Sequence, residues 1–180
     1  MSSIRLEILD AKRKEAFLRL ESLKDIGYLA GGTALSLQIK HRHSFDFDIF
    51  SGKEIERKEY LILKKFFSID KTILNTTEQL SVLTRDGVNI TLVFYPYKNL
   101  FPLIKTDSVS LLSLKDIAVD KAFTIGRRGT WRDYVDIFFL LKEGYISLSE
   151  IIKLAKRKFK EEFNEKLFLE QLVYFEDLGE

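Results

Sequence analysis

The sequence of residues 31–50 is GGTALSLQIKHRHSFDFDIF. The glycine pair opens an expected helix, and Asp46 and Asp48 lie in a run of aromatic and branched residues that indicates a strand. Side chains alternate between the faces of a strand, so the two carboxylates point the same way. Two carboxylates beside a glycine turn supply oxygen ligands for Mg²⁺ next to N–H groups that suit a phosphate. This arrangement suits the transfer of a nucleotide from a triphosphate.

Asp46 and Asp48 also have an ordinary interpretation, as two residues on a solvated strand face. Taken alone, an Asp-x-Asp pair does not decide between the two. The neighbours Phe45, Phe47 and Ile49 make the strand too apolar for an exposed edge, and charges beside a buried strand usually pair or hold a metal. We therefore predict that both aspartates are metal ligands.

The glycines could simply end the short strand expected at 28–30, because Gly-Gly is common in turns. Their context favours a phosphate site, since a strand precedes them, a helix follows, and the acidic strand comes next. Gly31 and Gly32 have no side chains, so a phosphate can approach the backbone closely. Thr33 adds a hydroxyl at the positive end of the helix.

A basic loop, residues 40–44, lies between the glycines and the aspartates. For His41 and His43 a solvated loop is the preferred interpretation, and a transition-metal site is the less favoured alternative. Arg42 and Ser44 are better candidates for nucleotide binding, because they stand beside the carboxylates, where triphosphate charge collects.

Composition restricts the classes of protein that need to be considered. The 180 residues suit one domain, or a domain with a helical extension, and the 15 Phe among many apolar residues argue against disorder. The absence of cysteine excludes disulfides and thiolate metal sites. Lys and Arg outnumber Asp and Glu by only 29 to 27, so any nucleic-acid footprint is local. No apolar stretch approaches membrane-spanning length, and we expect a cytoplasmic protein.

The hydrophobic pattern predicts an α/β first part and an all-helical second part. Asp86-Gly87 between two β-rich runs indicates a hairpin, and Ser113 and Ser147 each precede an acidic residue in the way that starts a helix. We predict an α/β core over 1–102 and a helical region packed on it over 103–180. The expected strands are 28–30, 45–50, 71–75, 79–84 and 88–95, and the expected helices are one or two within 4–26, then 33–40, 54–67, 115–127, 130–143, 148–161 and 164–176.

A second polar group lies in the helical part. Arg132, Asp133 and Asp136 fall on one stripe of an otherwise apolar helix, and such a stripe needs a partner. One interpretation is an internal network that ties this helix to Lys121 or Arg128; the other is direct participation in catalysis. The sequence leaves both open.

Three motifs, in this order, are similar to those of the AbiEii/AbiGii toxin family of nucleotidyltransferases, within the DNA polymerase β-like superfamily. The resemblance covers about 28–145. The motifs are Tyr-Leu-Ala-Gly-Gly-Thr-Ala-Leu at 28–35, Arg42-x-Ser44-x-Asp46-x-Asp48, and Lys121 followed by Arg128 and Arg132-Asp133-Tyr134-x-Asp136.

The resemblance implies a nucleotidyltransferase fold of the α+β (α/β) class, a small mixed sheet with flanking helices followed by a C-terminal helical bundle. It implies transfer of a nucleoside monophosphate from an NTP with Mg²⁺, to an acceptor that in relatives can be tRNA. It also implies a toxin with a separately encoded antitoxin. Catalytic roles would fall to Asp46, Asp48, Lys121 and Asp133, metal binding to Asp46 and Asp48, and nucleotide binding to Gly31, Gly32, Thr33, Arg42, Ser44, Lys121, Arg128, Arg132 and Asp136.

One departure from the superfamily pattern concerns a third carboxylate. Many polymerase β-like enzymes carry it on a following strand, and the candidate strand here, residues 88–94, has none. We predict that Asp133 supplies the missing acid, with Asp136 orienting Lys121 or Arg128. The main alternative is a catalytically weak or inactive member that binds nucleotide or protein as a regulatory module. A metal-dependent phosphohydrolase ranks third, because the glycine turn before a helix favours nucleotide transfer.

Overall fold

The computed structural model describes residues 4–174, and the chain forms two compact units. The first contains the chain up to Pro96 together with Leu103–Leu112. The second contains Tyr97–Pro102 and the chain from Ser113 onward. A single division at residue 102 was predicted, whereas the chain leaves the first unit after Pro96 and returns to it for Leu103–Leu112.

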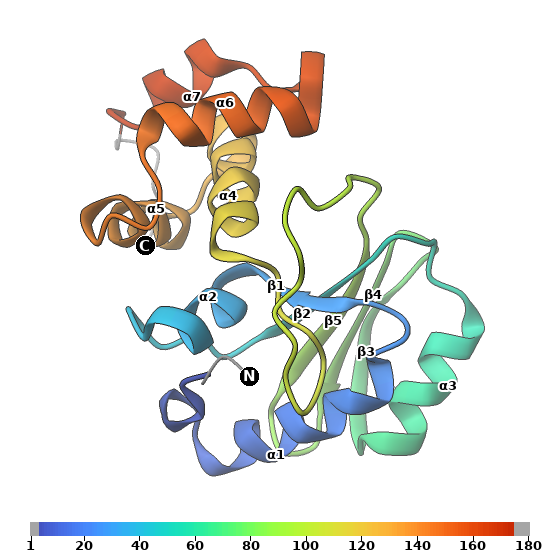
Figure 1. Cartoon of the computed structure of the whole chain (residues 1–180). Helices are drawn as coiled ribbons and strands as arrows, with labels where there is room; N and C mark the ends of the chain where they lie inside the picture. The colour runs from blue at the N-terminus through green and yellow to red at the C-terminus, as the bar shows by residue number, and fades with distance from the viewer. Residues whose placement is uncertain (1–3, 175–180) are drawn as a thin grey trace. The chain divides into compact units, whose positions relative to one another are not determined.

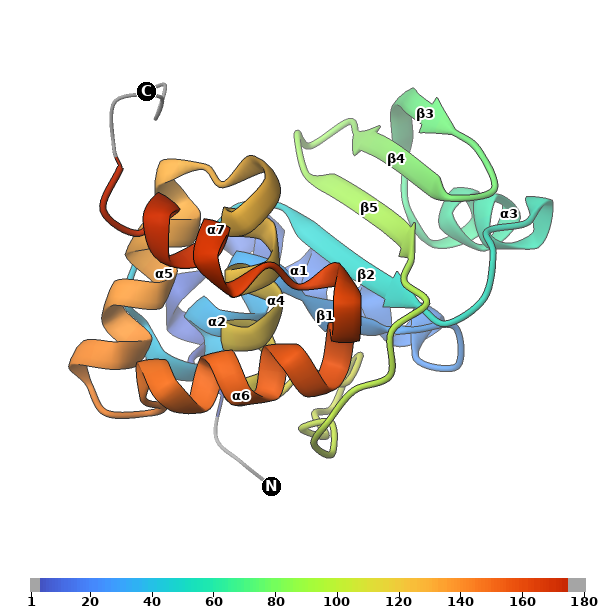
Figure 2. The ribbon, with the colours of Figure 1, turned by 90° about the horizontal axis from the view of Figure 1, so that it is seen from above.

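The first unit is built on a mixed five-stranded sheet, as predicted, with the strand order β1-β2-β5-β4-β3. Strands β2 and β5 run parallel, and the other neighbours are antiparallel. Figure 2 shows β2, β5, β4 and β3 side by side, with α3 next to β3. The elements are η1 (Leu6–Ile8), α1 (Ala11–Arg19), η2 (Leu20–Leu23), β1 (Tyr28–Ala30), α2 (Gly31–Ile39), β2 (Phe47–Ser51), α3 (Arg57–Phe66), β3 (Ile69–Asn75), β4 (Gln79–Thr84) and β5 (Asn89–Phe94).

The two faces of this sheet differ in chemistry because strand side chains alternate. One face is apolar and buried, and Phe17 of α1 packs against Phe47 there, with ring centroids 6.4 Å apart. The other face carries Asp48, with Thr91 paired beside it and Ser81 beside Thr91. The candidate carboxylates therefore lie on the polar face. The buried apolar residues of that face are Leu29, Phe47, Ile49, Leu80, Val82, Ile90 and Leu92.

The second unit is helical and is organised around α4, which contacts α5, α6 and α7 (Figure 1). Ser113 and Ser147 cap helices as the sequence predicted, each accepting the N–H of the acidic residue three positions later. Phe123 and Phe159 stack at 3.8 Å between centroids to join α4 and α6. The helices are α4 (Leu114–Arg128), α5 (Trp131–Lys142), α6 (Leu148–Phe159), η3 (Lys160–Glu162) and α7 (Glu165–Gln171).

A buried ion cluster that no sequence motif indicates joins α6 to α4. The ammonium of Lys158 contacts the carboxylates of Asp116 and Asp120, and the Lys158 side chain is fully buried. Asp116 also accepts the main-chain N–H groups of Leu100 and Phe101, at 2.8 and 3.0 Å. Asp116 therefore fixes the segment Tyr97–Pro102 to α4. None of the helices described is long and apolar enough to cross a membrane.

Candidate active site

The glycine turn forms the first side of the site. Gly31 begins α2 with φ +66°, a conformation that favours glycine. A Cβ on Gly31 would lie 3.2 Å from Oδ2 of Asp48, and one on Gly32 would lie 2.4 Å from Nη2 of Arg42. The turn therefore requires glycine at position 31, whereas a side chain at position 32 would displace the end of Arg42. The first N–H groups of α2 have no partner within the helix and suit a phosphate.

A hydroxyl network joins the glycine helix to the acidic strand. Oγ1 of Thr33 lies 2.8 Å from Oγ of Ser44 and donates to the main-chain carbonyl of Asp46. Thr33 is almost fully buried, so this network fixes the helix start against the segment that carries the carboxylates. Arg42 also donates to the carbonyl of His43, at 3.1 Å.

Asp46 and Asp48 follow the alternation predicted for them, although β2 begins only at Phe47. Both side chains are partly exposed, whereas Phe47 and Ile49 are buried on the opposite face. Nδ2 of Asn89 donates to Oδ1 of Asp46 at 3.1 Å and holds that carboxylate in place. No motif in the sequence marks Asn89 for this contact; it follows from the parallel pairing of β2 with β5.

The donor chemistry here fits a Mg²⁺ ion. Magnesium is usually held by one or two carboxylates together with substrate phosphates and water, and Asp46 and Asp48 supply those two carboxylates beside the glycine turn. Residues 4–174 contain no cluster of three or more His, Cys, Asp or Glu that could hold a metal by itself. His43 instead contacts the carbonyl of Ile8 at 3.3 Å and stacks on Phe45, which gives it a structural role.

Strand β5, on which no third carboxylate was expected, carries Thr91 beside Asp48. Thr91 pairs directly with Asp48 across β2 and β5. Its hydroxyl accepts from Oγ of Ser81 at 3.2 Å, and Ser81 accepts from Nε2 of Gln79 at 2.8 Å. A row of neutral polar groups therefore extends from Asp48 over β5 and β4.

Lys121, Asp133 and Asp136 form a second group, in the helical unit. Nζ of Lys121 lies 2.6 Å from Oδ1 of Asp133 and 2.8 Å from Oδ2 of Asp136, and all three side chains are buried or nearly so. Burial by itself lowers the pKa of Lys121, but the charges of Asp136 and Asp133 outweigh it and the pKa is raised. Lys121 is therefore a protonated cation that joins α4 to α5, as the network interpretation predicted.

Asp133 has a further structural task at the start of α5. Its Oδ2 accepts the main-chain N–H of Thr130 at 2.8 Å and the Thr130 hydroxyl at 2.9 Å, in a capping box. Arg128 and Arg132 are exposed, and Arg132 lies over the ring of Trp131. The predicted site residues thus gather as seven in the first unit and three in the second, with the two arginines on the surface of the second.

Replacing Gly32 by alanine tests the arginine side of the site. The added methyl would force the Arg42 guanidinium away from the helix start, while the helical backbone at Gly32 accepts alanine. We expect NTP affinity by calorimetry to fall roughly tenfold, the effect of one lost charge-assisted contact, with the melting temperature nearly unchanged. Gly52→Ala is the control, because a Cβ there meets nothing within 4 Å. Unaltered NTP affinity in the folded Gly32→Ala protein would remove Arg42 from the site.

The family described as "Nucleotidyl transferase AbiEii toxin, Type IV TA system" matches residues 66–179, more than half of the chain. The chain belongs to the AbiEii family. The AbiEii match begins after the segment with Gly31 and Asp48, so the glycine turn and the Asp-x-Asp pair lie outside it. This assignment confirms the nucleotidyltransferase class expected from the motifs.

Relatives of this AbiEii protein extend the similarity to its N-terminal part. The uncharacterized protein aq_aa25 of Aquifex aeolicus (strain VF5) is 31% identical over 176 residues, which covers 93% of this chain and 85% of that protein. The crystal structure of JHP933 from Helicobacter pylori superposes with a TM-score of 0.60 at 16% identity and covers 92% of this chain and 90% of its own. The Megavirus polyadenylate synthase gives 0.50 at 15% identity, over 76% of this chain and 33% of its own. At these identities, the two structures show a shared fold.

Proposed function

We propose that the protein transfers a nucleoside monophosphate from an NTP to an RNA, with tRNA as the first acceptor to test, in a Mg²⁺-dependent reaction. The observation that carries the proposal is the placement of Asp46 and Asp48 on the polar face of β2, beside the turn of Gly31 and Gly32. A carboxylate pair and a phosphate-binding helix start are the two parts that nucleotide transfer needs at one place.

The residues of the first unit have two tasks in the proposed reaction, metal binding and phosphate binding. Asp46 and Asp48 hold Mg²⁺, which when bound supplies charge neutralisation on the triphosphate. The first N–H groups of α2, with Thr33, Arg42 and Ser44, receive phosphate oxygens. Asp48 belongs here because its carboxylate faces the glycine turn directly.

The group transfer itself needs a nucleophile, a leaving group and a proton acceptor. A hydroxyl oxygen of the RNA attacks the α-phosphorus, the bond from that phosphorus to the bridging oxygen breaks, and pyrophosphate leaves with the bond electrons. We propose Asp133 as the acceptor of the hydroxyl proton and Lys121, with Arg128, Arg132 and Asp136, as the groups that receive and orient the triphosphate.

A labelled-transfer assay tests this function. The protein is incubated with tRNA and each α-³²P-labelled NTP in turn, with Mg²⁺ or with EDTA, and the RNA is resolved on a gel. We expect label on the RNA with at least one NTP, only when Mg²⁺ is present. NTP binding without any transfer would instead favour a nucleotide-binding regulatory module, the alternative that a β5 strand without an acidic residue supports.

The same family assignment places the protein in a toxin–antitoxin context, so we propose that this transfer disables the acceptor RNA and that a separately encoded antitoxin counteracts it. Expression of the protein alone should slow bacterial growth. The Asp48→Asn variant should not slow growth, because it lacks the transfer reaction on which growth inhibition is proposed to depend.

A further inference from the structure

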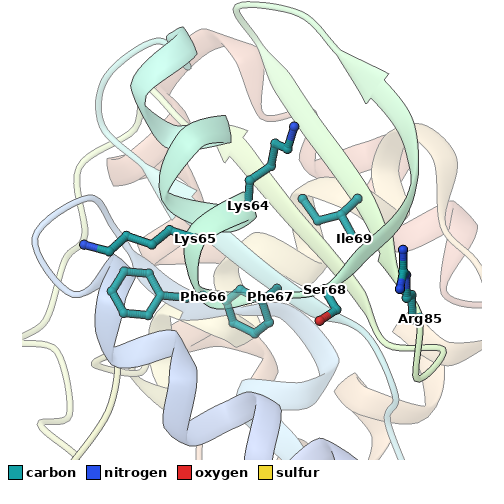
Figure 3. A pocket seen from close by; sticks show the side chains of 7 residues that line it. All are labelled: Lys64, Lys65, Phe66, Phe67, Ser68, Ile69 and Arg85. Carbon is teal, nitrogen blue, oxygen red and sulfur yellow. The ribbon is translucent and has the colours of Figure 1, made fainter.

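A surface hollow of about 320 Å³ lies at the junction of α3, β3 and the turn after β4. Its lining is basic and aromatic. Figure 3 shows Lys64 and Arg85 on either side of Ile69, while Lys65 points away beside Phe66. The residues that line it are Lys64, Lys65, Phe66, Phe67, Ser68, Ile69 and Arg85.

The cations of this hollow are not neutralised by the protein. Within residues 4–174 no carboxylate lies in ion-pair distance of Lys64, Lys65 or Arg85. The neighbouring Asp86 accepts a hydrogen bond from the side chain of Thr84, the main cause that lowers the pKa of Asp86. Three exposed cations with no anionic partner are complementary to a ligand that brings several negative charges.

The hollow is fixed in place by the backbone. The main-chain N–H of Arg85 donates to the carbonyl of Ser68 at 2.8 Å, and Ile69 pairs with Thr84 across β3 and β4. The loop before β3 and the turn after β4 therefore hold one geometry. Phe66 is 43% exposed and lies beside Lys65, so a ring on which a base can stack lies next to the hollow, on the side to which Lys65 points (Figure 3).

This hollow lies at the same end of the sheet as the carboxylates. Asn89, the first residue of β5, pairs with Leu83 near the end of β4 and donates to Asp46 before the start of β2. In the sheet, β4 lies two strand spacings from β2, and β3 lies three spacings from it. The hollow and the carboxylates are therefore about 10 to 15 Å apart. A chain of phosphates that reaches from one place to the other therefore spans several nucleotides.

We infer that the hollow of Lys64, Lys65, Ser68 and Arg85 binds the phosphate backbone of the RNA acceptor, upstream of the hydroxyl that receives the nucleotide. The inference rests on the proposed function and extends it by assigning an acceptor-binding surface. RNA is favoured over a protein partner because unpaired cations and a stacking ring are the two features that single-stranded nucleic acid requires.

The test combines three neutral substitutions, Lys64→Gln, Lys65→Gln and Arg85→Gln, in one variant. Fluorescence anisotropy measures its affinity for a labelled single-stranded RNA long enough to reach from the hollow to the carboxylates, and for a labelled dinucleotide. We expect the longer RNA to bind at least roughly tenfold more weakly, with the slope of log affinity against log salt reduced by about 2. The dinucleotide and NTP affinities should stay unchanged.

The matched control removes three charges, by Lys14→Gln, Lys105→Gln and Lys153→Gln, at exposed lysines that lie outside the hollow. Normal binding of the longer RNA by the triple variant, with NTP binding intact, overturns the inference and leaves the proposed function standing. If the triple variant binds RNA normally but is no longer counteracted by the antitoxin in cells, the inference is also overturned, and the hollow is a protein-docking site instead. A wild-type protein that binds no NTP removes the proposed function, and the inference with it.

Discussion

Replacing Asp48 by asparagine is expected to abolish Mg²⁺-dependent transfer, with a loss of about a thousandfold or more. Asp48 lies beside the glycine turn, where a Cβ on Gly31 would approach its Oδ2 to 3.2 Å. An amide has nearly the same shape but lacks the charge that a divalent cation requires. Labelled-NTP transfer under single-turnover conditions measures the loss.

The melting temperature of Asp48→Asn distinguishes a metal-binding role of Asp48 from a structural one. Asp46 and Asp48 are two like charges on one strand face, and without a metal they repel. Asp48→Asn should therefore melt at the same temperature as the wild type or slightly higher. The control is Asp25→Asn, an acidic residue outside the site. If Asp48→Asn unfolds, or still transfers at the normal rate, the metal assignment is wrong.

The site in the first unit could be predicted from local sequence because its residues lie within a short stretch. Alternation along one strand places Asp46 and Asp48 on one face, and a glycine pair before a helix indicates a phosphate site. The motifs predicted that Thr33 and Ser44 belong to the same site, and in the structure their hydroxyl oxygens lie 2.8 Å from each other. These inferences use only neighbours along the chain.

Contacts between distant segments could not be read in the same way. The hydrogen bond from Asn89 to Asp46 depends on the parallel pairing of β2 with β5, and local hydrophobic periodicity does not specify which strands pair. The burial of Lys158 against Asp116 could not be predicted, because the many Lys, Arg and Glu residues around Lys158 are typical of a solvated helix. Its fully buried side chain is seen only when α6 packs on α4.

The division of the chain shows the same limit. Leu103–Leu112 belongs to the first unit because Leu111 forms bridges with Leu29 and Ile104. Isolated bridges leave no periodic pattern, so the segment after Pro102 was predicted to belong to the helical part. Helix starts were predictable, in contrast, because Ser113 and Ser147 cap their helices through residues only three positions away.

Replacing Lys121 by methionine is expected to destabilise the helical unit strongly. The methionine keeps the packing of the stem but leaves Asp133 and Asp136 buried together without their cation, which lies 2.6 and 2.8 Å away in the wild type. Removing one partner of a buried ion pair costs about 3 to 5 kcal/mol. For a protein of this size that corresponds to a melting temperature lower by roughly 10 °C, measurable by calorimetry.

The pH dependence of this loss follows from the pKa of Lys121, which is raised above its ordinary value of 10.5 mainly because two carboxylates outweigh desolvation. A group with a raised folded-state pKa contributes stability that is complete below its unfolded pKa. The difference in unfolding free energy between wild type and Lys121→Met should therefore stay constant up to about pH 10 and narrow as the pH rises through the raised pKa. A difference that vanishes already at neutral pH would contradict a protonated Lys121.

A double variant tests whether Lys121 also binds the triphosphate. Asp136→Asn added to Lys121→Met removes one of the two uncompensated charges, so the double variant should recover part of the lost stability. Nucleotide affinity should not recover with it if Lys121 contacts the triphosphate, because the cation is still absent. Full NTP affinity in the refolded double variant would instead show that Lys121 acts only by joining α4 to α5 through Asp133 and Asp136.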